Sequence, residues 1–92
     1  MYRVSDGVRS THGQDGAVVL DIGRGRMFSI NRVGSRILEL LEAGAGQNEI
    51  VSTISEEFST DAKLVQSDVR KFVEALQGYG LVTENPAKAM DS

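Results

Sequence analysis

The chain has 92 residues, 40% of them hydrophobic and 25% charged, and its 10 lysines and arginines against 13 aspartates and glutamates give a formal net charge of −3 at pH 7. A chain of this length forms one domain and buries roughly 60% of its unfolded surface, so it needs no covalent staples. The absence of cysteine excludes disulfides, thiolate catalysis and sulfur-ligated metals, and the acidic balance argues against DNA binding through non-specific phosphate contacts.

The sequence contains no segment typical of a membrane span or a targeting signal. No apolar run approaches the roughly 20 residues that cross a bilayer, and the N-terminus MYRVSDGVRS lacks a charged start followed by an apolar segment. We therefore expect a cytoplasmic protein with no membrane partner.

The start of the chain alternates weakly between apolar and polar side chains. The turn-like pair Asp6-Gly7 interrupts this alternation and predicts a short, bulged edge strand. The apolar members of that strand are Tyr2, Val4 and Val8. The polar stretch STHGQD at residues 10–15 is predicted to be a loop.

Two dense β-type runs come next, at residues 17–22 and 26–30, joined by Gly23-Arg24-Gly25. Runs separated by a few glycine-rich residues predict an antiparallel hairpin. Successive side chains of a strand point to opposite faces. In the first run, one face carries Val18, Leu20 and Ile22, and the other carries Val19 and Asp21. In the second run, one face carries Phe28 and Ile30, and the other carries Met27 and Ser29.

Three amphipathic helical patterns follow the hairpin. Asn31 is a good N-cap for the first, which ends at Gly44 and Gly46 and whose apolar residues are Val33, Ile37, Leu40 and Leu41. The second starts near Gln47 or Asn48 and carries Ile50, Val51, Ile54 and Phe58. The third follows three candidate caps at residues 59–61, ends at Gly78 and Gly80, and carries Val65, Val69, Phe72, Val73, Leu76 and Tyr79.

This order of elements predicts an α+β fold, a winged helix-turn-helix in which a three-stranded antiparallel sheet precedes three helices. We assign residues 1–83 to this domain, with Leu81-Val82 folding back onto the core, and residues 84–92 to a flexible tail. The last strand of such a sheet is free to accept a partner. The pattern therefore points to binding rather than catalysis.

The sequence shows no arrangement of residues typical of a catalytic site. His12 is the only histidine, and we expect a solvated loop residue with no serine–acid partner rather than a general base. The pair Glu56-Glu57, and Asp61 with Asp68, fall on exposed helical faces or caps. The turn at residues 23–25 lies inside a hairpin and opens no helix, so it does not form a phosphate loop. We predict no enzyme activity, no metal ligand and no cofactor.

Two surface features have both a functional and an ordinary interpretation. The first is a set of basic residues around the hairpin tip and first helix, namely Arg24, Arg26, Arg32 and Arg36. They form either a small patch for an acidic partner or a solvated face balanced by neighbouring acids, namely Asp21, Glu39 and Glu42. The second is Met27, which lies opposite Phe28 and Ile30 in strand parity, so some apolar surface is expected near the last strand.

The succession GAVVLDIGRGRMFSIN, RVGSRILELLEAG, IVSTISEEF and SDVRKFVEALQGYGLV resembles the PqqD-like family, the stand-alone recognition domains that bind the leader segment of ribosomally made, post-translationally modified peptides. The resemblance covers residues 3–83. Its most specific parts are Asp21, Gly23 and Gly25 in the hairpin, Ile30-Asn31, Gly34, and the ending from Asp68-Val69 to Gly80-Leu81-Val82. Many family members have Ile-Trp where this chain has Ile37-Leu38. The chain also lacks a Pro-rich opening, which favours a lasso-peptide or other radical-enzyme-linked pathway.

The resemblance implies that the leader peptide adds as an antiparallel strand beside residues 26–30, in the groove against the third helix. The site residues that it implies are Arg26, Met27, Phe28, Ser29 and Ile30 on the strand, and Leu64, Val65, Asp68, Val69 and Phe72 on the helix. Main-chain hydrogen bonds supply affinity in this mode, and side-chain pockets supply selectivity. The implied partners are a precursor leader peptide and a maturation enzyme, either a lasso-peptide protease or cyclase or a radical SAM enzyme.

Two other functions fit the same order of elements. One is a DNA-binding winged helix that reads with residues 62–78, although Lys63, Arg70 and Lys71 are offset there by Asp61, Asp68 and Glu74. The other is a non-catalytic accessory subunit that dimerises through its exposed strand. We expect a monomer or a weak homodimer that binds no nucleic acid.

Overall fold

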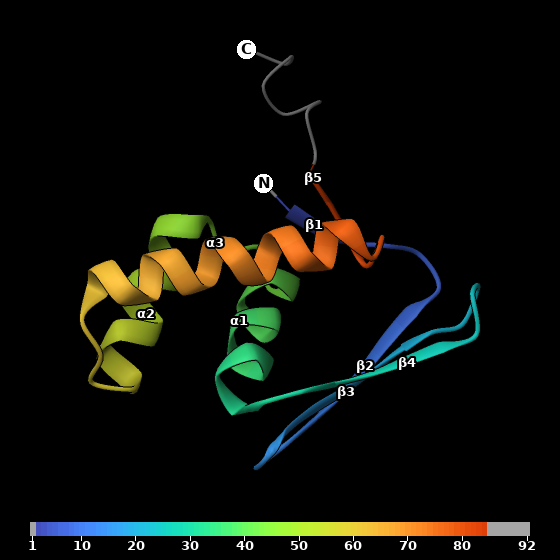
Figure 1. Ribbon diagram of the computed structural model, residues 1–92, viewed down its shortest axis with the longest axis horizontal. Helices are drawn as coiled ribbons and strands as arrows, with labels where there is room; N and C mark the ends of the chain where they lie inside the picture. The colour runs from blue at the N-terminus through green and yellow to red at the C-terminus, as the bar shows by residue number, and fades with distance from the viewer. Residues whose placement is uncertain (1, 85–92) are drawn as a thin grey trace.

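The computed structural model describes residues 2–84 (Figure 1). Its elements in chain order are β1 (Tyr2–Val4), β2 (Val8–Gly13), β3 (Gly16–Asp21), β4 (Arg26–Ile30), α1 (Arg32–Glu42), α2 (Gln47–Glu57), α3 (Ala62–Gly78) and β5 (Val82–Glu84). The fold is α+β, with a three-stranded antiparallel sheet in the order β2-β3-β4 and three helices after it, compatible with a winged helix-turn-helix. The predicted fold class is confirmed.

Side chains of the central strand β3 alternate between a core face of the sheet and an outer face. On the core face Ala17, Val19 and Asp21 are buried, and α1 packs against this strand. On the outer face Val18 and Leu20 are 40% and 41% exposed. Figure 1 shows this sheet projecting to one side of the three helices. The helices therefore cover only one face of it.

The N-terminal segment forms two strands where one was predicted. Residues 10–13, predicted as a loop, continue β2 and pair with β3 in unbroken register, so only Gln14 and Asp15 form the turn. The prediction failed because polar residues occupy inward positions of β2. Ser10 and His12 are partly buried there, and both hydrogen-bond to side chains of α1. Polar side chains are tolerated in a buried strand when they have hydrogen-bond partners. Composition alone does not show whether such partners exist.

The helices begin and end where the sequence indicates. The Asn31 side chain accepts a hydrogen bond from the amide of Gly34 at 2.8 Å, and the Asp61 side chain accepts one from the amide of Lys63 at 2.8 Å. Side-chain acceptors at these positions satisfy amides that have no intrahelical partner. One predicted core position in α1 is wrong, because Val33 is 36% exposed while Leu38 is 3% exposed.

The end of the described chain is part of the fold. Leu81 and Val82 are buried, as predicted, and β5 pairs antiparallel with β1. Glu84, assigned to the tail from the sequence, is opposite Tyr2 in this pairing. The two strands complete each other's backbone hydrogen bonds, which a polar composition does not reveal. The rest of the predicted tail, residues 85–92, lies outside the described residues.

Candidate peptide-binding groove

The first element of the candidate site is the free edge of β4. In the part of the chain that the structure describes, β4 pairs with β3 on one side and with no strand on the other. A sheet edge of this kind presents backbone amides and carbonyls to an incoming strand. Which residues present them depends on the register of the hairpins.

The register assigns the outward-facing backbone groups to Met27 and Ser29. A two-residue turn joins the pair Gly13 and Gly16, so this pair must be hydrogen-bonded, and hydrogen-bonded pairs then recur at every second residue. The amide of Ile22 donates to the carbonyl of Gly7 at 3.0 Å, which agrees with this alternation. Residues 17, 19 and 21 of β3 therefore bond to residues 30, 28 and 26 of β4. Met27 and Ser29 direct their amides and carbonyls away from the sheet.

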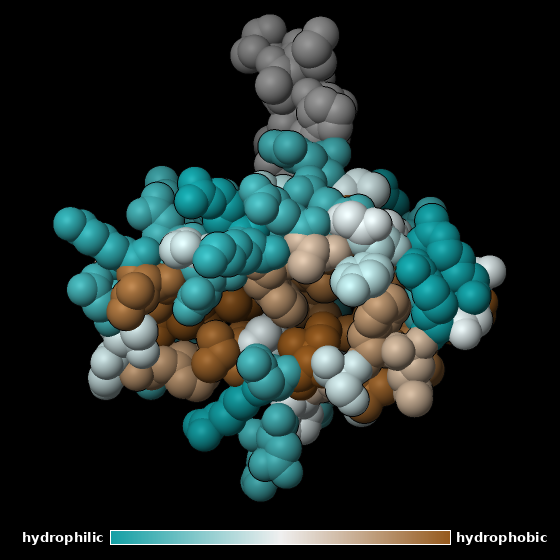
Figure 2. Space-filling model, viewed as in Figure 1, coloured by the Kyte–Doolittle hydropathy of each residue, from teal (hydrophilic) through white to brown (hydrophobic). Residues whose placement is uncertain are grey.

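The second element is a close contact among β4, α1 and α3. An ideal Cβ placed on Gly34 of α1 would lie 2.6 Å from Ile30 Cγ2 and 3.0 Å from Phe72 Cε1. Ile30 and Phe72 thus both approach this backbone position closely. We call the surface between the free edge of β4 and α3, with Ile30, Gly34 and Phe72 at its base, the β4–α3 groove. Figure 2 shows hydrophobic side chains along this side of α3, between the helix and the start of α1, with hydrophilic atoms on both borders.

The other predicted residues of α3 divide between core and surface. Val65 and Val69 are 3% and 0% exposed, so they belong to the core, whereas Leu64 is 62% exposed. Asp68 is exposed at the border of the β4–α3 groove. Beside it lies a cavity of about 90 Å³ between the helices. Its lining includes Val33, Ile37, Ile54, Phe58, Val65, Asp68 and Val69. The exposed Val33 and the half-buried Phe58 were not predicted as site residues, because their apolar spacing is that of ordinary core positions.

At one end of the β4–α3 groove, residues of β4 contact Tyr79, the residue that follows α3. The rings of Phe28 and Tyr79 are 4.9 Å apart, and the guanidinium of Arg26 lies 5.3 Å from the Phe28 ring centroid. Arg26 also donates to the Tyr79 carbonyl at 2.6 Å. Tyr79, predicted as part of the core stripe, is 51% exposed and instead fixes the start of β4 against the end of α3.

Arg26 is held by a buried carboxylate. It donates to Asp21 Oδ2 at 2.8 Å, and Arg24 donates to the same oxygen at 3.2 Å. The hydrogen bond from Arg26 lowers the pKa of Asp21 below its ordinary value of 3.8, burial opposes this, and Arg24 lowers it further. Asp21 is therefore charged at neutral pH and orients Arg26 at the end of the groove.

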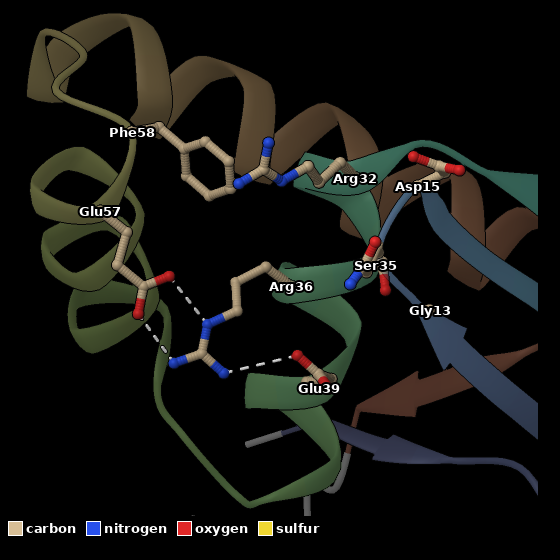
Figure 3. Close-up of a pocket in the computed structure, with 9 residues that line it drawn as sticks. Gly13, Asp15, Arg32, Ser35, Arg36, Glu39, Glu57 and Phe58 are labelled. Atoms are coloured by element: carbon tan, nitrogen blue, oxygen red, sulfur yellow. Dashed lines mark hydrogen bonds and ion pairs between the residues drawn. The ribbon is translucent and has the colours of Figure 1, made fainter.

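The four arginines do not form one basic patch. Arg24 and Arg26 lie at the hairpin tip, while the other two line a polar pocket near the opposite end of the hairpin (Figure 3). Arg36 donates two 2.8 Å hydrogen bonds to Glu57, which lower the pKa of that carboxyl and raise the pKa of Arg36. Arg32 lies 5.7 Å from the ring centroid of Phe58. The positive charges of Arg24, Arg26 and Arg36 are therefore balanced by neighbouring carboxylates, as in the second interpretation of these residues.

His12 is not the solvated loop residue that the sequence suggested. Its Nδ1 lies 2.7 Å from Ser35 Oγ, and its Nε2 lies 3.3 Å from Glu42 Oε1. Ser10 donates to Glu42 at 2.6 Å. A serine–acid environment therefore exists, contrary to expectation, because strand pairing brings residues 10 and 12 onto α1. Ser35 is only 5% exposed, and these hydrogen bonds fasten β2 to α1.

Residues 2–84 contain neither a metal-ligand cluster nor a membrane-spanning helix. No group of three histidine, aspartate or glutamate side chains gathers in a metal-binding arrangement within these residues. No helix of the same segment has the length and apolar character needed to span a membrane.

The α+β fold with an open strand edge is shared with a known family and with solved structures. The family described as Coenzyme PQQ synthesis protein D (PqqD) matches residues 16–82, and the chain belongs to this family. The structure of TbiB1 in complex with the TbiA(beta) leader peptide is 40% identical in sequence, with a TM-score of 0.83 over 90% of this chain and 96% of that chain.

A second solved structure has the same fold at lower identity. It is lasso peptide synthetase B1 complexed with the leader peptide, which matches with a TM-score of 0.82 and 18% identity over 90% of this chain and 98% of that chain. No curated protein sequence matches this chain significantly.

Replacing Gly34 with alanine tests the contact at the base of the groove. Alanine is ordinarily favoured over glycine in a helix by about 1 kcal/mol, but here its Cβ would overlap Ile30 and press on Phe72. We expect Gly34→Ala to lower the free energy of unfolding by about 1–3 kcal/mol, measured by urea denaturation. Gly78→Ala is the matched control, because nothing lies within 4 Å of its added Cβ, and it should be neutral or stabilising. A stabilising Gly34→Ala would contradict the contact.

The stability contributed by Asp21 should depend on pH in a defined direction. A group whose pKa is lowered by folding stabilises the protein above its unfolded pKa, and this contribution is lost as the pH falls through the lowered pKa. Asp21→Asn should therefore be less stable than the parent protein at about pH 7, with the difference shrinking towards about pH 3. Urea denaturation of both proteins at the two pH values measures this. Asp6→Asn is the control, since the Asp6 side chain is 96% exposed, and a similar effect of both substitutions would contradict the assignment.

Proposed function

We propose that this protein binds the leader segment of a ribosomally synthesised precursor peptide as an added antiparallel strand beside β4 and presents it to a maturation enzyme. The observation that carries the proposal is the free β4 edge, with the backbone groups of Met27 and Ser29 facing outward, beside an apolar groove. The proposal is also supported by the 40% sequence identity to TbiB1, whose structure was solved in complex with a leader peptide. The protein itself catalyses no step and acts in the cytoplasm, where ribosomal precursors are made.

The groove provides both parts of peptide recognition by strand addition. Backbone groups at the edge of β4 pair with the peptide irrespective of its sequence, whereas pockets select alternate side chains. Side chains on the core-facing side of the added strand enter between β4 and α3, next to Ile30 and Phe72. Leu64 and the cavity beside Val33 and Phe58 extend the apolar surface, and Asp68 at its border pairs with a basic leader residue. A disordered leader loses entropy on binding, so we expect a Kd between about 1 μM and tens of nanomolar.

The DNA-binding alternative gains no support from the site. On α3, the exposed basic residues Lys63, Arg70 and Lys71 are interspersed with exposed Asp61, Asp68 and Glu74. A face without net positive charge has little of the counterion-release term that drives phosphate binding. We propose a lasso-peptide protease or cyclase, or a radical SAM enzyme, as the partner, with the protein itself a monomer or weak homodimer.

A proline at Ser29 tests strand addition directly. Proline has no amide hydrogen, and the amide of Ser29 points away from β3, so the hairpin keeps its own hydrogen bonds while the added strand loses one. We expect Ser29→Pro to weaken binding of the TbiA(beta) leader peptide at least about fivefold, corresponding to about 1 kcal/mol. Ser29→Ala, which keeps the amide, should bind within about twofold of the parent protein. Fluorescence anisotropy measures both, and equal affinities would contradict strand addition at this edge.

Chemical-shift mapping locates the groove independently of any substitution. On addition of the same leader peptide, amide perturbations should concentrate in residues 26–30 and 64–73. Phe72→Ala should remove a central apolar contact and weaken binding by more than about 1 kcal/mol, whereas Val51→Ala, at a half-buried position of α2, should not. A map centred on β1, or on α2, would show that the peptide binds elsewhere.

A further inference from the structure

The outer face of the sheet, opposite the face that packs on the helices, carries an apolar patch. Its strand members are Val18, Leu20 and Met27, which are 40%, 41% and 70% exposed. Ile22, in the turn after β3, is 62% exposed and continues the β2–β3 pairing through its amide, which donates to the Gly7 carbonyl. Leu20 is opposite Met27 in the β3–β4 pairing, and Val18 is opposite Ser29. Contiguous exposed apolar side chains on a small protein mark an interaction surface. We call Val18, Leu20, Ile22 and Met27 the outer-face patch.

The charge around the outer-face patch limits the kind of partner. Arg9 is opposite Leu20 and Thr11 is opposite Val18, so both side chains lie on the same face. Arg9 is the one ionisable side chain on this face of β2, β3 and β4, because the outward positions of the three strands are residues 9, 11, 13, 16, 18, 20, 27 and 29. A second copy of the chain would bring no carboxylate to Arg9 from these strand positions, and Asp6, in the turn that flanks Ile22, is paired with Arg3. The patch therefore fits a different protein, with an apolar surface bordered by a carboxylate.

The outer-face patch is continuous with the proposed peptide edge. Met27 and Ser29 direct their backbone groups to the free edge of β4 and their side chains to the outer face. An added strand would therefore extend this face by one row, because alternate side chains of the peptide would lie beside Met27 and Ser29. A protein bound to the outer face would touch both this chain and the peptide.

We propose that the outer-face patch is the docking surface of the enzyme that processes the bound precursor. This inference rests on the proposed function. If the domain and its peptide form the surface jointly, the enzyme docks more strongly when the peptide is bound. The difference in docking free energy is the coupling free energy between peptide and enzyme. The apolar residues supply the buried contact, and Arg9 pairs with a carboxylate of the enzyme at the border.

The test is processing of a precursor by its purified maturation peptidase, with this protein as the limiting component. Leu20→Glu combined with Ile22→Glu places two charges in the patch without altering any residue assigned to the groove. We expect stimulation of processing to fall at least about tenfold, while affinity for the leader peptide changes less than about twofold. Asn48→Glu, at an exposed position of α2, is a control that adds one such charge away from the patch, and it should leave both quantities unchanged.

The outcomes separate this inference from the function on which it rests. If the parent protein binds no leader peptide, the proposed function fails. If it binds the leader and stimulates processing, and the double variant does the same, the docking surface is overturned. A double variant that loses leader affinity in the same proportion as processing also overturns it, because the patch would then act through the groove. Sedimentation of a parent dimer that becomes monomeric in the double variant would assign the patch to a second copy instead.

Discussion

At Gly34 the end of β4, the first turn of α1 and the middle of α3 come within van der Waals contact of one another. The side chains that meet there, from Ile30 and Phe72, leave no room for a Cβ. This contact sets the distance between the strand edge and α3, and thus the width of the groove between them. The helix accepts glycine here at a cost in intrinsic propensity, because the close approach requires it.

The two ends of the hairpin are held by different means. At the tip, buried Asp21 binds Arg26, and Arg26 in turn binds the carbonyl of Tyr79. Near the other end, His12 and Ser10 join β2 to α1 through Ser35 and Glu42. Hydrogen bonds fix direction more strictly than apolar contacts do. The sheet is therefore oriented against the helices, while the edge of β4 and the outer face of the sheet stay open.

An open edge exposes a protein to unwanted pairing, and short length is one way in which this risk is limited. β4 has five residues, of which only Met27 and Ser29 present outward backbone groups. Such an edge offers few hydrogen bonds, so selectivity has to come from side-chain contacts beside it. The apolar surface along α3 provides these contacts on one side of the edge, and the outer-face patch lies on the other.

The sequence by itself determined the class of fold, the hairpin at residues 17–30 and the bounds of the helices, because these depend on local periodicity and capping residues such as Asn31 and Asp61. It also identified the edge strand and, through family resemblance, the helix that faces it.

Only the tertiary structure decided that residues 10–13 form a strand, since the polar side chains of Ser10 and His12 are satisfied by partners more than 20 residues away in α1. It likewise separated Val65 and Val69, which are core, from exposed Leu64, because the family resemblance implies all three as site residues without indicating their burial. Tyr79 shows the same limit, since its apolar spacing predicts burial while its contacts are with β4. The spacing of residues along a helix defines which way each side chain points. The neighbour that it contacts depends on how distant segments of the chain pack.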